Sequence, residues 1–82
     1  MKVRGIRGAI TVTEDTEETI ITATTELLNE MIAVNGLKKE NVASVTFSLT
    51  PDLNSAFPAV AARKLDWNNV ALFCCQELAI ND

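Results

Sequence analysis

Histidine and tyrosine are absent from this sequence of 82 residues, and cysteine, glycine and proline are scarce. The two cysteines, Cys74 and Cys75, are adjacent, so they cannot supply the spaced ligands of a zinc site. Neighbouring cysteines also form a poor structural disulfide, which indicates reduced thiols and a cytoplasmic protein. Without histidine or a serine elbow, no nucleophile–base pair can be built. We therefore expect no metal site and no covalent catalysis.

Basic residues are also few. Seven Lys and Arg stand against eleven Asp and Glu, which leaves a net charge of -4. Because phosphate backbones require a basic face, this balance argues against nucleic acid as a partner. No apolar run approaches the roughly 18 residues that cross a bilayer, so we expect no membrane partner. The length allows one domain, and a domain so small favours oligomerisation as a source of further burial.

The first half of the sequence predicts a strand followed by a helix. Residues 2–12 are rich in β-branched side chains and have no helical period, which predicts a first strand. Apolar residues at helical spacing predict a helix over about 16–34. Asp15, followed three residues later by Glu18, has the pattern of an N-cap with its capping box, and Gly36 is typical of a helix stop.

The second half predicts a strand, a short helix and a further strand. Residues 43–49 alternate cleanly between apolar and polar, as a half-buried strand does. The composition of 50–54 is typical of a turn, and a short helix begins at Pro58 and continues to about residue 65. The apolar run 70–74 predicts a third strand inside a sheet. The fold class is therefore α/β, with the order β-α-β-α-β.

Residues suited to binding lie at the ends and edges of these elements. Arg7 is in the first strand, Arg63 on the short helix, Cys74 at the end of the last strand and Glu77 just beyond it. Sheets of α/β proteins bind their ligands at strand ends. Each residue also has an ordinary structural interpretation: Arg7 and Glu77 as surface charges, Arg63 as a helix C-terminal charge, and Cys74 as a small buried side chain. The residues alone indicate a non-covalent anion site and leave these alternatives open.

Several short motifs together resemble the small monofunctional chorismate mutases of the trimeric α/β type. They are RGIRGA at 4–9, TPDL at 50–53, FPA at 57–59, Arg63, and CCQE at 74–77. The resemblance implies a mixed β-sheet with flanking helices in a trimeric pseudo-barrel, with active sites in clefts between subunits. It also implies isomerisation of chorismate to prephenate, in phenylalanine and tyrosine biosynthesis, with no cofactor.

The resemblance also implies roles for individual residues. Arg7 would bind a substrate carboxylate and Glu77 would accept a hydrogen bond from the ring hydroxyl, with Cys74 beside it. The side chains that would line the cleft from the neighbouring subunit are Phe57, Ala59, Arg63 and Phe73.

Three departures from the family pattern affect what the chain is expected to do. Val60 stands where the family commonly has a lysine, and Phe73 where it often has a threonine. The family also has a strand beyond the QE motif that carries a second essential arginine, and later a tyrosine. We therefore expect residues 1–82 to be a single chorismate-mutase-like domain, incomplete at its C-terminal side and crippled or inactive alone. The alternatives are a non-catalytic trimeric module for small carboxylates, or a related trimeric fold with other ligands.

Overall fold

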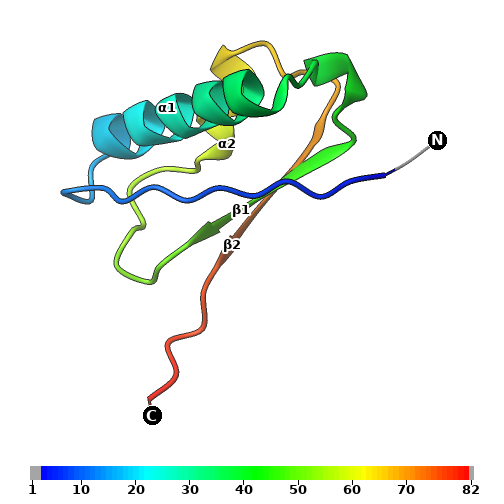
Figure 1. Cartoon of the computed structure of the whole chain (residues 1–82). Helices are drawn as coiled ribbons and strands as arrows, with labels where there is room; N and C mark the ends of the chain where they lie inside the picture. The colour runs from blue at the N-terminus through cyan, green and yellow to red at the C-terminus, as the bar shows by residue number, and fades with distance from the viewer. Residues whose placement is uncertain (1–2, 82) are drawn as a thin grey trace.

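The computed structural model describes residues 3–81, in which helices cover one face of a two-stranded sheet (Figure 1). The helices are α1 (Glu17–Asn35), the 3-10 helix η1 (Lys39–Asn41) and α2 (Ala59–Lys64), and the strands are β1 (Ser44–Leu49) and β2 (Ala71–Gln76). The two strands are parallel, and α2 lies in the connection between them. The predicted α/β class is confirmed, and so are both predicted helices to within one or two residues.

The two faces of the sheet differ in burial. In β1 the apolar positions, Phe47 among them, are half-buried and the alternating serines and threonine are exposed, as the sequence predicted. Phe47 is in register with Cys74 of β2, whereas Phe73 lies on the opposite face and is 62% exposed. The prediction that this last strand lies inside a sheet is therefore wrong for the described chain, in which β2 has a strand neighbour on one side only. The helices cover only one face of the sheet.

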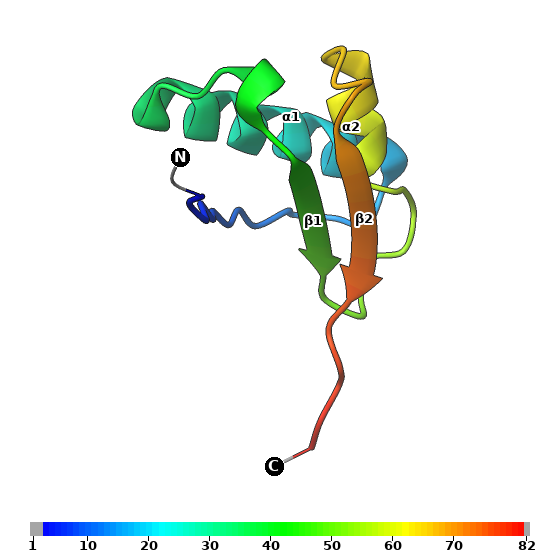
Figure 2. The ribbon, with the colours of Figure 1, turned by 90° about the vertical axis from the view of Figure 1, so that its right-hand side faces the viewer.

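The predicted first strand is not formed. Lys2 lies outside the described residues, and residues 3–12 have no strand structure; residues 3–11 are exposed and Val12 is half-buried. Figures 1 and 2 show this segment running beneath α1. A Cβ atom on Gly8 would lie 3.0 Å from Sδ of Met31, so the segment packs closely on that helix. β-branched side chains favour a strand, but a strand also needs a hydrogen-bonded neighbour. Within the described chain the order is therefore α-β-α-β.

The N-cap of helix α1 lies one residue later than predicted. Thr16, not Asp15, is the N-cap, and its hydroxyl accepts a hydrogen bond from the Thr19 backbone N–H at 3.1 Å. The prediction of Asp15 is wrong because its carboxylate has other partners, described below. Gly36 ends the helix as predicted, with a φ of 60°, and its N–H donates to the Ile32 carbonyl. The buried side of α1 includes Ile20 and Leu28.

The core forms where both helices meet the sheet. Leu28 of α1, Ala62 of α2 and Trp67 are buried together, and half-buried side chains of both strands pack around them. Trp67 follows Asp66, whose left-handed φ of 63° turns the chain after α2. The Trp67 backbone N–H then donates to the Ala62 carbonyl at 3.1 Å, which keeps the backbone of Trp67 beside α2.

We expect Gly36→Ala to lower the free energy of unfolding by about 1 kcal/mol. Alanine at a left-handed φ is strained, whereas glycine adopts it without cost. Gly5→Ala is the matched control, because a Cβ there meets nothing within 4 Å and its φ is not positive. Urea unfolding followed by circular dichroism measures both variants. Equal loss of stability in the two would contradict the role of Gly36 in the cap.

Candidate functional site

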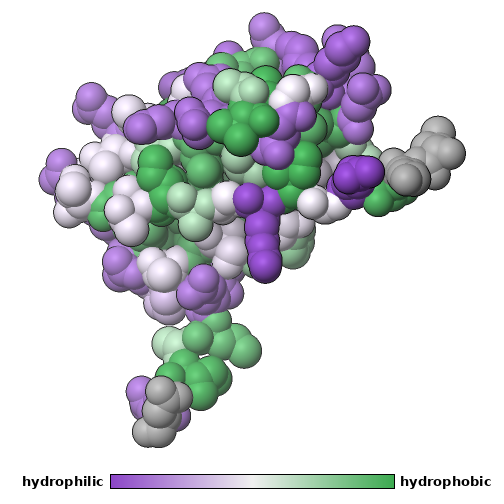
Figure 3. Space-filling view, viewed as in Figure 1, coloured by the Kyte–Doolittle hydropathy of each residue, from purple (hydrophilic) through white to green (hydrophobic). Residues whose placement is uncertain are grey.

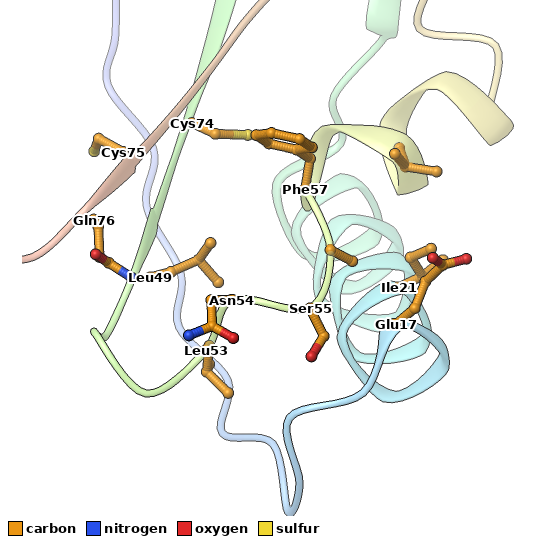
Figure 4. Close-up of a pocket in the computed structure, with 12 residues that line it drawn as sticks. Glu17, Ile21, Leu49, Leu53, Asn54, Ser55, Phe57, Cys74, Cys75 and Gln76 are labelled. Atoms are coloured by element: carbon orange, nitrogen blue, oxygen red, sulfur yellow. The ribbon is translucent and has the colours of Figure 1, made fainter.

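A groove of about 510 Å³ opens at the carboxyl ends of the two parallel strands (Figure 4). Its lining comes from α1, the ends of β1 and β2, the loop before α2, and α2 itself. The lining residues are Glu17, Ile21, Leu49, Leu53, Asn54, Ser55, Ala56, Phe57, Val60, Cys74, Cys75 and Gln76. Because parallel strands end at the same edge, this is the edge where α/β sheets bind ligands.

Two of the predicted site residues meet in this groove. Figure 4 shows the side chain of Cys74 pointing from β2 toward the ring of Phe57, which comes from the loop before α2. Cys74 is half-buried, whereas Phe57 is 69% exposed. The pair forms one wall of the groove, with a thiol and an aromatic face available to a ligand. Residues separated by 17 positions are adjacent here because the α2 crossover returns the chain to the sheet.

The loop that carries Phe57 is fastened to the start of α1 through Asp15. Its Oδ1 accepts hydrogen bonds from the backbone N–H groups of Asn54, at 2.9 Å, and Ser55, at 3.0 Å. The Ser55 hydroxyl donates to the Asp15 carbonyl oxygen at 2.9 Å. Nothing in the local sequence distinguishes this pairing from helix capping, because both use an aspartate before an acidic helix start.

The lining of the groove carries little charge. Glu17 is the single acidic side chain among its twelve residues, and none of them is Lys or Arg. Polar groups come instead from Asn54, Ser55 and Gln76, and the Gln76 side-chain amide donates to the Pro51 carbonyl at 3.4 Å. The lining by itself therefore offers hydrogen bonds and apolar contact, and no cation for an anionic ligand.

The predicted arginines lie outside this lining. Arg7 is exposed in the N-terminal segment, and Arg63 is exposed on α2 near its C-terminal end. Phe73, also predicted to line a cleft, is on the uncovered face of the sheet. These three side chains are exposed on the surface and free to contact another molecule.

Glu77 and Ala59 also lie outside the lining, for different reasons. Glu77 directly follows β2, and its N–H donates to the Leu49 carbonyl at 2.7 Å, so its backbone is held beside the end of β1. Its side chain is exposed. Ala59 is only 3% exposed and offers almost no surface to a ligand.

Large apolar side chains are exposed on several segments. Figure 3 shows apolar residues in the middle of the face that the N-terminal segment crosses, and along the C-terminal segment. The exposed large apolar residues are Val3, Ile6, Ile10, Val34, Phe57, Phe73, Leu78 and Ile80. None of the described helices is long and apolar enough to cross a membrane.

Comparison with known proteins identifies the family. The family model for chorismate mutase type I matches residues 3–82. The chorismate mutase AroH of Thermus thermophilus is 52% identical over 79 residues, which are 95% of this chain and 65% of that protein. The Bacillus subtilis chorismate mutase AroH is 47% identical over 81 residues, 98% of this chain and 64% of that protein.

A solved structure supports the same assignment. The chorismate mutase from Clostridium thermocellum matches with a TM-score of 0.83 and 41% identity, over 85% of this chain and 62% of that one. The chain belongs to the chorismate mutase type I family. It spans about 65% of the length of the curated relatives that it matches.

Proposed function

We propose that this chain is the larger part of a chorismate mutase, which isomerises chorismate to prephenate in the biosynthesis of phenylalanine and tyrosine. One observation carries the proposal: the family match extends over the whole described chain, and two of its predicted site residues, Cys74 and Phe57, face each other in one groove. Such an enzyme would work in the cytoplasm.

The reaction suits the side chains that the groove and its surroundings provide. The rearrangement is intramolecular, so it needs no nucleophile, no general base and no cofactor. The protein must hold the substrate in its compact reactive conformation and stabilise the charge that separates as the ether bond breaks. Arginines, one carboxylate and apolar walls are sufficient for that task.

Three residues of this chain are proposed to contact the substrate. Arg7 would pair with a substrate carboxylate through both guanidinium N–H groups. Glu77 would accept a hydrogen bond from the ring hydroxyl, and Cys74 would lie beside it at the groove. The backbone bond from Glu77 to Leu49 supports its assignment, because it holds the base of that side chain at the strand end.

The remaining contacts would come from a neighbouring subunit of a homotrimer. Phe57, Ala59, Arg63 and Phe73 would line the cleft between subunits, although the burial of Ala59 limits it to a minor contact. Two observations support an assembly: the groove lining has no cation of its own, and apolar side chains are exposed around it. A second subunit would cover the apolar surface and bring a cation to the groove.

We also propose that residues 1–82 form one domain that is completed by a further C-terminal part. The test uses two proteins, the 82-residue chain and an extended chain, in which Asp82 is followed by the part of the Thermus relative that lies beyond the match. We expect the extended chain to accelerate the loss of chorismate absorbance, and the 82-residue chain to be at least about a hundredfold slower because a transition-state cation is missing.

The outcomes of this test separate the candidate functions. Absence of acceleration in both proteins, when the extended chain is folded, would contradict the mutase. Binding of a bicyclic transition-state analogue by the folded extended chain, without turnover, would favour the non-catalytic binding module.

We expect Val60→Lys to strengthen binding of a dicarboxylate analogue by the extended chain about threefold to tenfold. Val60 lines the groove, and a lysine there would supply the charge that the lining lacks. Val60→Gln is the matched control, with similar length and no charge. Isothermal titration calorimetry gives both affinities. Equal affinities of the two variants would show that charge at this position does not contribute.

A further inference from the structure

Asp15 joins the loop that carries Phe57 to the start of α1 by hydrogen bonds. Among the hydrogen bonds of the described residues, those that join residues 53–57 to a distant part of the chain all involve Asp15. The other bonds of this loop are local: the Leu53 N–H donates to the Thr50 carbonyl and the Val60 N–H to the Phe57 carbonyl. Two of the three bonds that join the loop to the start of α1 are therefore accepted by the Asp15 carboxylate, and the third by its backbone carbonyl.

Phe57 is only two residues beyond the atoms that Asp15 holds. Its ring is 69% exposed, so core packing does not fix its place. Figure 4 nevertheless shows the ring and the Cys74 side chain directed toward one another, and both line the groove. The backbone beside Phe57 decides which positions its ring can reach, and hydrogen bonds to a carboxylate are stronger than bonds between neutral groups.

We propose that Asp15 is a positioning residue, which holds Phe57 over Cys74 and so sets the width of the groove. Asp15 does not line the groove and acts through the loop backbone. The inference rests on the proposed function only in taking this groove as part of the substrate site. The position of Phe57 over Cys74 can be measured without any catalytic activity.

The first experiment measures how often the Phe57 ring moves away from Cys74. In a Cys75→Ser background, Cys74 is the only thiol, and its alkylation by iodoacetamide reports access past the Phe57 ring. We expect Asp15→Ala to raise the alkylation rate about tenfold, because local opening follows the loss of hydrogen bonds. Asp15→Asn retains an acceptor oxygen, so its rate should stay within about twofold of the parent.

Asp52→Ala is the matched control. It removes an exposed aspartate from the neighbouring turn, which forms none of these hydrogen bonds, and should leave the alkylation rate unchanged. An unchanged rate in folded Asp15→Ala, or an equal rise in Asp52→Ala, would overturn the proposal. If Asp15→Ala does not fold, Asp15→Glu decides, because its longer side chain displaces the carboxylate from the Asn54 and Ser55 N–H groups. A faster rate at unchanged melting temperature supports the proposal, and an unchanged rate refutes it.

The second experiment uses chorismate turnover by the extended chain. We expect Asp15→Ala to raise KM about tenfold with kcat within threefold, because Phe57 contributes to binding in ground and transition state alike. Asp15→Asn should restore most of the KM. An equal loss of kcat in both variants would contradict a positioning role. If the extended chain is inactive, the proposed function fails, while the alkylation result still decides what Asp15 holds in place.

Discussion

Replacing Arg7 by alanine in the extended chain is expected to lower kcat/KM for chorismate by a hundredfold or more. Arg7 is the cation that we assign to a substrate carboxylate, and none of the residues that line the groove is Lys or Arg. Removing a charged donor from such a site costs about 3 kcal/mol or more. Arg7→Lys keeps the charge and loses the paired N–H groups, so we expect a loss of about tenfold. Loss of chorismate absorbance measures all three proteins.

Arg4→Ala is the control that separates a specific contact from general charge. Both arginines are exposed in the N-terminal segment, and each substitution removes one positive charge from a chain whose net charge is -4. We expect Arg4→Ala to retain activity within about threefold, as a surface charge does when it acts only at long range. Equal losses in Arg4→Ala and Arg7→Ala would show that Arg7 acts only through net charge.

Trp67→Ala is expected to leave the chain largely unfolded at 25 °C. Trp67 is 5% exposed and is the largest side chain in the buried cluster with Leu28 and Ala62. Truncating a buried tryptophan to alanine costs about 3 to 5 kcal/mol, which approaches the whole stability of a small domain. Far-UV circular dichroism during a urea titration measures the loss, since the variant retains no tryptophan fluorescence.

Val34→Ala provides the comparison for this loss. Val34 is 71% exposed near the end of α1, so deleting its methyl groups should change the unfolding free energy by less than about 0.5 kcal/mol. Trp67→Phe should lie between the two. If Trp67→Ala unfolds at the same urea concentration as Val34→Ala, the cluster around the indole is not the core of this domain.

Sequence patterns predicted correctly those features that depend on interactions between residues close in sequence. The apolar stripe that includes Ile20 and Leu28 faces the core as its helical spacing predicted, and Gly36 ends that helix. The alternation around Phe47 placed one face of β1 inside. In each case the deciding interactions join residues within a few positions of one another, or depend on a periodicity that any amphipathic element must have.

The errors arose where a partner is distant in sequence. Asp15 reads as a helix cap, but its carboxylate binds backbone groups 39 and 40 positions away. Trp67 belongs to the polar stretch at 66–69, which in sequence indicates only the end of a helix. The left-handed turn at Asp66 nevertheless brings Trp67 into the core. The partners of Asp15 and the neighbours of Trp67 could not be predicted, because they depend on the path of the chain between β1 and β2.

The candidate site shows the same contrast between what short motifs predict and what depends on distant contacts. The motifs around Arg7, Cys74 and Glu77 were sufficient to predict the family, and the family match confirms that prediction. Their roles at the substrate remain proposals. The structure brings Cys74 to Phe57 and leaves Arg7 on the surface, in the segment where residues 3–12 have no strand neighbour.

The sequence by itself determined the amphipathic helix, the half-buried strand and the family, because these depend on side-chain periodicity and on short motifs. Only the tertiary structure decided that Asp15 holds a loop, that Trp67 is core, and that residues 3–12 form no strand. Those three facts depend on contacts between residues far apart in the chain. Hydrogen bonds to Asp15, burial of Trp67 and pairing of 3–12 each require a second segment, whose position no local pattern contains.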